Sequence, residues 1–212
     1  MKELYIIGAG GLGRETADTV CAINERTPEY KIVGFLDDAE TLRGSVINDI
    51  PVLGGRAYLK ENTDASKPCA VIAVADPRAK ETIADDLNAF VIWENIVHPT
   101  AVVSRYAEIG CGAIIQSHTI LSSNTKIGNH VIINVSSVLG HDAVLEDFVS
   151  VMSLCDITGG VHIGKGAYLT SSVAVIPNVR IGEYAYIGAG STVIKDVNAN
   201  AIMVGNPARQ IR

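Results

Sequence analysis

The sequence predicts two domains, a small α/β domain over residues 1–96 and an all-β parallel β-helix over residues 97–212. Two patterns carry this prediction. In the second half an aliphatic residue returns at every sixth position, and in the first half short apolar segments alternate with helical ones around a glycine-rich turn. The composition agrees with a repetitive β structure, because aromatic residues are only 5% of the chain whereas 20 residues are glycine.

In the first domain, an apolar strand at residues 4–7 leads into the sequence Gly-Ala-Gly-Gly-Leu-Gly at residues 8–13, and residues 14–25 have a helical composition. A second strand is expected at residues 31–36, ending at Asp37 and Asp38. A third is expected at residues 69–75, ending at Asp76 before a polar helix. This alternation predicts a small parallel sheet built from βαβ units.

The glycine-rich turn fits the G-x-G-x-x-G fingerprint of Rossmann-like domains, because it follows a strand, opens a helix and is followed by the acid Asp37. Such a turn holds a pyrophosphate on backbone N–H groups at the start of a helix, and any diphosphate can use it. A domain of this size supplies about half of a dinucleotide site. A nucleotide-sugar diphosphate is therefore favoured, with a dinucleotide or a purely structural turn as alternatives.

In the second domain, the repeat of six residues (a hexad) begins at Val97 and continues without a slip to Val193. The first place of every hexad is aliphatic, and the fifth place, from Ala101 to Val197, is always small or β-branched. Strand side chains alternate, so a fifth-place residue and the aliphatic residue two positions later face the same side. Each hexad is then one side and one corner of a triangular coil, and the coils stack as parallel strands. A β-sandwich of ordinary strands has no reason to keep this period.

Glycine often follows the aliphatic place, where we expect the chain to turn a corner and to need freedom in φ. These glycines are Gly110, Gly128, Gly140, Gly164, Gly182 and Gly188.

The charge argues against a nucleic-acid partner, because 17 Lys and Arg residues against 23 Asp and Glu residues give a net charge of −6. No apolar stretch is long enough to span a membrane, and the apolar run at residues 4–7 is too short for the core of a signal peptide. We therefore expect a cytoplasmic protein without a membrane partner. The cysteines form no C-x-x-C pair and are expected to be small buried thiols, namely Cys21, Cys69, Cys111 and Cys155.

The five histidines all avoid the first and fifth hexad places, so none of them needs to lie in the core. No two of them share a column of stacked coils, and no metal site within one column is expected. They are His98, His118, His130, His141 and His162.

His141 differs from the other histidines by its surroundings. It lies in the middle of the repeat between Gly140 and Asp142, and the residues one coil away, Ser123 and Gly159, are small enough to leave space for a thioester. Asp142 can reach the His141 ring only if the chain turns between them, and it is otherwise a solvated acid.

Over nearly its whole length the chain resembles the bacterial NeuD/PglD-type family of nucleotide-aminosugar N-acetyltransferases and sialic acid O-acetyltransferases. The matching segments are residues 5–13, 34–38, 140–142, 187–191 and 204–209. This resemblance implies a left-handed β-helix, a homotrimer and acetyl-CoA as the acetyl donor, with no metal.

The resemblance also implies roles for individual residues. His141 is expected to be the general base and Asp142 the acid that orients it. Backbone around Gly159, Gly188, Ala189 and Pro207 is expected to line the acetyl-CoA groove between subunits, and the nucleotide-sugar acceptor is expected to bind at Gly8, Gly10, Gly11 and Asp37. Two departures concern the acceptor, because several family members carry histidine at the positions of Leu12 and Ser150.

The favoured function is acetyl transfer from acetyl-CoA to the amino group of a nucleotide-linked aminosugar, such as a 4-amino-4,6-dideoxyhexose. The uninterrupted hexads leave no room for a large acceptor-binding loop, so the first domain should bind the acceptor. The nearest alternative is O-acetylation of a sialic acid. A zinc enzyme or a non-catalytic scaffold on the same β-helix and a nicotinamide oxidoreductase are more distant alternatives.

Overall fold

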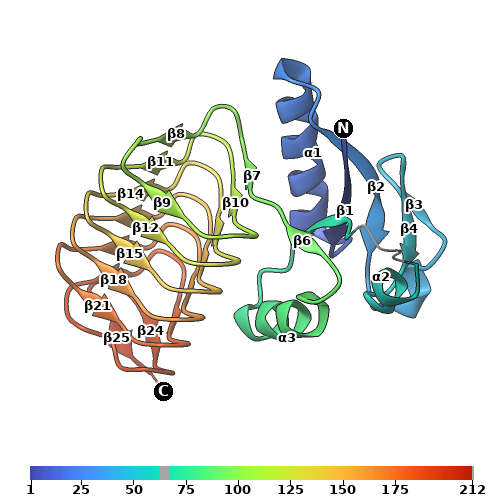
Figure 1. The fold of residues 1–212 in the computed structure, drawn as a ribbon. Helices are drawn as coiled ribbons and strands as arrows, with labels where there is room; N and C mark the ends of the chain where they lie inside the picture. The colour runs from blue at the N-terminus through green and yellow to red at the C-terminus, as the bar shows by residue number, and fades with distance from the viewer. Residues whose placement is uncertain (63–66, 212) are drawn as a thin grey trace.

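The computed structural model describes residues 1–62 and 67–211, and it shows a small α/β domain beside a stack of parallel β coils, as the predicted fold class requires (Figure 1). In the part of the chain that is described, no helix is long and apolar enough to cross a membrane. The N-terminal domain is a six-stranded sheet in the order β3-β4-β2-β1-β5-β6, in which only β3 and β4 pair antiparallel. Its elements are β1 (Lys2–Ile7), α1 (Gly11–Arg26), β2 (Tyr30–Leu36), the 3₁₀ turn η1 (Glu40–Leu42), β3 (Val46–Ile47), β4 (Ile50–Gly54), α2 (Ala57–Asn62), β5 (Cys69–Ile72), α3 (Pro77–Leu87) and β6 (Ile92–Trp93).

Alternating side chains put apolar residues on both faces of this sheet. Ile6 of β1 packs in one cluster with Val20 of α1, whereas the next residue, Ile7, packs in another with Leu87 of α3. The predicted strands are confirmed with shifted ends. The third strand, β5, ends before residue 75, because the chain turns there to Asp76, whose carboxylate caps α3 by accepting from the Ala79 N–H at 2.7 Å.

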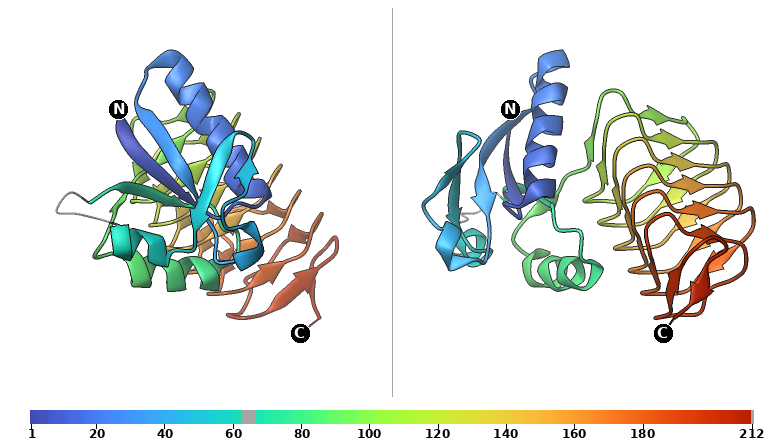
Figure 2. Two further views of the ribbon diagram at one scale, coloured as in Figure 1. Left: turned by 90° about the vertical axis from the view of Figure 1, so that its right-hand side faces the viewer. Right: turned by 180° about the vertical axis from the view of Figure 1, so that it is seen from behind.

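The C-terminal domain is a triangular prism of stacked coils whose three sides are parallel sheets (Figures 1 and 2). Side 1 contains β7 (Ile96–Val97), β10 (Ile114–Ile115), β13 (Ile132–Ile133), β16 (Ser150–Val151), β19 (Tyr168–Leu169), β22 (Tyr186–Ile187) and β24 (Ile202–Val204), the last paired antiparallel with β25 (Arg209–Gln210). Side 2 contains β8 (Val102–Val103), β11 (Ile120–Leu121), β14 (Val138–Leu139), β17 (Asp156–Ile157), β20 (Ala174–Val175) and β23 (Thr192–Val193). Side 3 contains β9 (Glu108–Ile109), β12 (Lys126–Ile127), β15 (Val144–Leu145), β18 (His162–Ile163) and β21 (Arg180–Ile181).

The prism core consists of the two hexad places that the sequence predicted. First-place residues stack on those of the next coil, as Ile115 pairs with Ile133, and both are fully buried. Fifth-place residues from Ala113 onward are buried beside them. Val103, which belongs to the first coil, is an exception and is 37% exposed.

The corners differ from our expectation. The glycines after the aliphatic place have no positive φ, whereas every fourth hexad place from Gly112 to Gly190 is left-handed, with φ between 52° and 71°. The glycines are needed for close stacking instead, because a Cβ on Gly140 would lie 2.5 Å from the Gly159 nitrogen of the next coil. The same correction applies to Gly110, Gly128, Gly164, Gly182 and Gly188, where an added Cβ would meet neighbouring atoms at 2.8 Å or less.

The N-terminal domain covers side 1 of the prism. The outward-facing Ile96, Ile114 and Ile132 of side 1 belong to the same apolar cluster as residues of β1 and α1. Lys80 of α3 is fully buried, and its ammonium donates to the prism, namely to the carbonyls of His130 at 3.0 Å and Val149 at 3.1 Å and to Ser150 Oγ at 2.8 Å.

His130 is buried at this contact, although, as expected, it does not lie in the prism core. It occupies a corner place, where the prism alone would leave it in solvent. The N-terminal domain covers that corner, and the ring stacks on Phe148 with centroids 5.3 Å apart and meets Trp93 edge-on at 4.8 Å. Only 4% of His130 is exposed.

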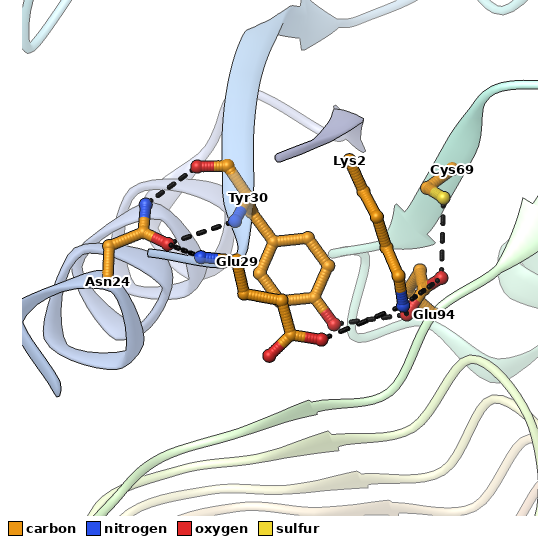
Figure 3. A network of polar contacts seen from close by, with 6 residues as sticks. All are labelled: Lys2, Asn24, Glu29, Tyr30, Cys69 and Glu94. Carbon is orange, nitrogen blue, oxygen red and sulfur yellow. Dashed lines mark hydrogen bonds and ion pairs between the residues drawn. The ribbon is translucent and has the colours of Figure 1, made fainter. Parts of the chain in front are cut away.

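The segment between the domains is fixed to the sheet by Glu94, as Figure 3 shows. Its carboxylate accepts from Lys2 Nζ at 3.0 Å, from the Tyr30 hydroxyl at 3.0 Å and from Cys69 Sγ at 3.3 Å. Burial alone would raise the pKa of Glu94, but the hydrogen bonds from Lys2, Cys69 and Tyr30 outweigh it and lower the pKa. Glu94 is therefore ionised, and its carboxylate binds side chains of the three strands β1, β2 and β5.

The cysteines agree only in part with our expectation. Cys69 and Cys155 are buried, and burial raises the pKa of each thiol to about 11, in Cys69 together with the hydrogen bond to Glu94. Cys21 and Cys111 are exposed, because they lie on the outer surface of α1 and in a prism corner. The prediction of a buried thiol is wrong for these two.

Candidate active site

His141 and Asp142 form a pair at the corner between sides 2 and 3, in the turn from β14 to β15. Asp142 has a φ of 60°, and this left-handed turn brings its carboxylate back toward the preceding side chain. His141 Nδ1 lies 2.8 Å from Asp142 Oδ2. The chain thus turns between the two residues, which is the condition under which Asp142 can reach the His141 ring. Because a carboxylate only accepts, Nδ1 is assigned the proton, and Nε2 keeps its lone pair.

Gly159, one coil further along, provides the space beneath the His141 ring. A Cβ at this position would lie 2.6 Å from His141 Nε2, so any larger residue would displace the imidazole. The His141 side chain is 74% exposed and the Asp142 side chain 57%. The His141 ring is therefore largely open to solvent.

Sequence reasoning did not identify Asn124, which contacts the same pair from the preceding coil. Its Nδ2 donates to Asp142 Oδ1 at 3.1 Å. Hydrogen bonds from His141 and from Asn124 hold the pKa of the Asp142 carboxyl below its usual value. The repeat contained the signal for this contact, because Asn124 and Asp142 are three hexads apart and so lie in one column.

Two of the predicted acceptor residues, Gly8 and Asp37, line a cavity of about 180 Å³ at the carboxyl ends of β1 and β2, whereas Gly10 and Gly11 do not line it. This is the edge where ligands bind in open parallel sheets. Pockets that enclose a whole drug-sized ligand measure roughly 300–1,000 Å³, so this cavity holds only part of a nucleotide-sugar. Its lining residues are Ile7, Gly8, Leu36, Asp37, Asp38, Val74 and Ile83.

The fold requires glycine at some positions of the turn and not at others. Gly8 has a φ of 107°, and a Cβ there would lie 2.7 Å from the Ala73 carbonyl oxygen. Gly13 packs directly on the Gly8 carbonyl. At Gly10 an added Cβ would meet nothing within 4 Å, and at Gly11 only the end of the Arg14 side chain at 4.0 Å. The fold therefore explains the first and last glycines, while the surface over the middle two is open for a ligand.

Asp37 uses both carboxylate oxygens to hold the chain around this cavity. Oδ2 accepts from the Ala9 N–H and Oδ1 from the Ala39 N–H, each at 2.9 Å. In the structure Asp37 thus shapes the glycine-rich turn. Its expected contact with the nucleotide-sugar stays a prediction.

Gly188 and Ala189 lie at the corner between sides 1 and 2, next to the C-terminal segment that contains Pro207. A Cβ on Gly188 would lie 2.8 Å from the Val204 side chain, and the Ala208 N–H donates to the Thr192 carbonyl at 2.8 Å. A cavity of about 210 Å³ adjoins this segment. It is lined by Val193, Ile194, Lys195, Asp196, Met203, Ala208, Arg209 and Gln210.

The three groups of predicted site residues do not meet within one chain. His141, Asp142 and Gly159 lie at the corner between sides 2 and 3, which is opposite the side that the N-terminal domain covers. Gly188, Ala189 and Pro207 lie at another corner. Gly8, Gly10, Gly11 and Asp37 lie in the other domain. Within one chain the predicted site residues therefore lie at three separate places.

The two departures from the family pattern have structural roles here. Ser150 is buried, accepts from Lys80 and donates to the Ala75 carbonyl at 2.7 Å, so it joins the domains. Leu12 packs against the apolar cluster of the sheet and side 1. Within residues 1–62 and 67–211, no group of three or more His, Cys, Asp or Glu residues is placed to hold a metal ion.

Known proteins resemble both domains. Residues 3–87 match the family described as PglD N-terminal domain. The chain is 32% identical over 222 residues to GDP-perosamine N-acetyltransferase of Escherichia coli O157:H7, and the match covers 99% of this chain and 97% of the relative.

Among solved structures, the acetyltransferase domain of PglB from Neisseria gonorrhoeae has a TM-score of 0.93 at 25% identity, with 100% of each chain covered. PerB from Caulobacter crescentus, in complex with CoA and GDP-perosamine, shares the fold with a TM-score of 0.88 at 24% identity, covering 100% of this chain and 98% of that one. These matches confirm the left-handed β-helix. With a full-length relative above 30% identity, the chain belongs to the NeuD/PglD-type family of acetyl-CoA-dependent sugar acetyltransferases.

Proposed function

We propose that the protein transfers the acetyl group of acetyl-CoA to the amino group of a nucleotide-linked aminosugar of the 4-amino-4,6-dideoxyhexose type, with GDP-perosamine as the first candidate. The full-length similarity to a GDP-perosamine N-acetyltransferase supports this acceptor. The observation that carries the chemistry is the 2.8 Å contact between His141 Nδ1 and Asp142 Oδ2, which leaves Nε2 as an exposed base.

In the proposed reaction, the neutral amine of the sugar attacks the thioester carbonyl of acetyl-CoA. His141 Nε2 accepts the proton that the amine loses as the new C–N bond forms, and Asp142 stabilises the resulting imidazolium. Backbone N–H groups near Gly159 would stabilise the oxyanion of the tetrahedral intermediate. When this intermediate collapses, the C–S bond breaks and the CoA thiolate takes the proton from the imidazolium. No acetyl-enzyme is formed.

We also propose that the active site is assembled between subunits of a homotrimer. Side 2 of the prism joins the corner of His141 to the corner of Gly188, so a second prism packed there brings these two corners together. Side 2 has the apolar surface that such packing needs, since Val102 is 61% exposed and Ile120 38%. Leu154, at the neighbouring corner, is 61% exposed.

The trimer is tested by light scattering at micromolar concentration. The expected mass is roughly 67 kDa, three times the 22.4 kDa of one chain. A monomeric mass would contradict both the trimer and the shared site.

The acceptor is tested with the purified protein, acetyl-CoA and a panel of GDP-, UDP- and dTDP-linked 4-amino sugars together with sialic acid. We expect release of CoA thiol with a GDP-linked aminosugar and a product that gains one acetyl group on nitrogen. Thiol release only with sialic acid would overturn the proposal in favour of O-acetylation. Thiol release with none of these acceptors would overturn the proposed acceptor class.

A further inference from the structure

Asn124 extends the His141–Asp142 pair by one residue. It lies one coil before Asp142 in the same corner column, and both residues are left-handed, with φ of 62° and 60°. The Asp142 carboxylate uses one oxygen for each neighbour, since Oδ1 accepts from Asn124 Nδ2 at 3.1 Å and Oδ2 contacts His141 Nδ1 at 2.8 Å. The three side chains form one hydrogen-bonded series.

We propose that Asn124 is a positioning residue for acetyl transfer, because it fixes the rotation of the Asp142 carboxylate that orients the His141 imidazole. This inference rests on the proposed function, in which His141 is the general base. Asn124 itself would not contact the reacting atoms.

The carboxylate needs such a second contact. Rotation of a carboxylate about its terminal bond is only weakly restricted, and the Asp142 side chain is 57% exposed. A single hydrogen bond to the imidazole would leave both groups free to swing together. The Asn124 side chain can provide this contact because its main chain is held against the next coil. The Asp142 N–H donates to the carbonyl of Ser123, the residue that precedes Asn124, at 3.0 Å.

The charges at this corner agree with the proposed role. Among the described residues, the titratable group that acts on Asp142 is His141, and Asn124 adds a neutral donor. The amide thus favours the ionised carboxylate without competing for the positive charge on the imidazolium.

Asparagine at a corner also has a simpler explanation, because it tolerates the left-handed conformation better than most residues. Asn178 provides the comparison within the molecule. It lies in the same column with a φ of 63°, and its amide packs over Gly160, which separates it from Asp142. A test must therefore remove the Asn124 side chain without straining the corner.

The variants are Asn124→Gly, which keeps the left-handed backbone accessible, and Asn178→Gly as the matched control. We expect Asn124→Gly to lower kcat by about tenfold, because small misplacements of catalytic groups reduce rates strongly. The KM values for acetyl-CoA and the acceptor should stay within about twofold, since the pair orients a base and does not bind either substrate. Asn178→Gly should retain the wild-type kcat.

Asn124→Asp provides a readout that a purely structural role would not change. It has nearly the same shape but replaces the neutral donor with a second carboxylate beside Asp142, which contacts His141. A nearby negative charge stabilises the imidazolium, so the acidic limb of kcat/KM should move to higher pH. An unchanged limb would contradict the proposed contact.

The decisive comparison repeats Asn124→Gly in the Asp142→Asn background. If Asn124 acts through Asp142, its removal should cost little once Asp142 is gone, because residues that act as a unit are not additive. An equal fold loss in both backgrounds, or wild-type kcat in Asn124→Gly, would overturn the inference. Full activity in His141→Ala would instead overturn the assigned base. The two failures are thus distinguishable.

Discussion

The His141 imidazole is held by the backbone as much as by its polar partner. The left-handed turn at Asp142 brings the carboxylate to Nδ1, and the absence of a side chain at Gly159 leaves room beneath the ring. Both features follow from the corner, where the backbone of one coil lies against the next. The geometry of the His141–Asp142 pair is therefore a local property of the β-helix.

Replacing His141 with alanine should lower kcat by roughly 10²–10⁴, the usual contribution of a positioned base. Acetyl-CoA binding and the mass of the assembly should persist, because the imidazole is 74% exposed and supports no core packing. Asp142→Asn should cost less, and the double variant should be little slower than His141→Ala. The acidic limb of kcat/KM should disappear in His141→Ala, since a neutral imidazole is required. Wild-type turnover in His141→Ala would contradict the assignment.

At the scale of elements, the glycine-rich turn between β1 and α1 contains two kinds of glycine, those that the fold requires and those that it does not. Gly8 and Gly13 are required by close contacts of the backbone, whereas the surface over Gly10 is empty. Gly10 is also the N-cap of α1, and no side chain caps the helix there. A diphosphate at this helix start would use both the open surface and the N–H groups.

Gly10→Val should therefore raise the KM for the nucleotide-sugar strongly, because the added side chain occupies the space that the diphosphate needs. The KM for acetyl-CoA should stay nearly unchanged, and so should the Tm. Gly13→Ala is the contrasting variant and should lower the Tm, since its Cβ would press on the Gly8 carbonyl. Equal losses of affinity for both substrates in Gly10→Val would show that the turn is only structural.

The elements were more predictable than their contacts. The period of six specified the prism, since the aliphatic and small places that it picks out are the buried ones. It also placed Asn124 beside Asp142, although this contact was not recognised in the sequence. Docking of the domains could not be predicted, because Ile96, Ile114 and Ile132 occupy outward-facing places like any other and become buried only through the partner domain. The burial of His130 follows from that docking, whereas the separation of the His141 and Gly188 corners follows from the repeat itself.

At the scale of the whole molecule, the contact between the domains contains a histidine that is held neutral. His130 stacks on Phe148, and its Nδ1 is buried without a hydrogen-bond partner within the described residues. Burial, and then the charge of Lys80, lower the pKa of His130 to about 4. Burial also lowers the pKa of Lys80, whose ammonium nevertheless has three oxygen acceptors for its three protons.

Docking of the domains should consequently weaken in acid. In the unfolded chain His130 has an ordinary pKa near 6.5, so between about pH 6.5 and pH 4 the unfolded state binds more protons than the folded state. The stability from this site is fully present above about pH 6.5 and falls as the pH drops toward 4, by up to about 3 kcal/mol.

His130→Phe should reduce this dependence, because it keeps an aromatic ring without a titratable group, and Phe148 adopts the same left-handed corner with a φ of 62°. His118→Phe, at an exposed corner, is the control and should keep the wild-type profile. Denaturant unfolding at fixed protein concentration from pH 4 to pH 8 measures the difference. Parallel profiles for the wild type and His130→Phe would show that acid acts elsewhere than at this contact.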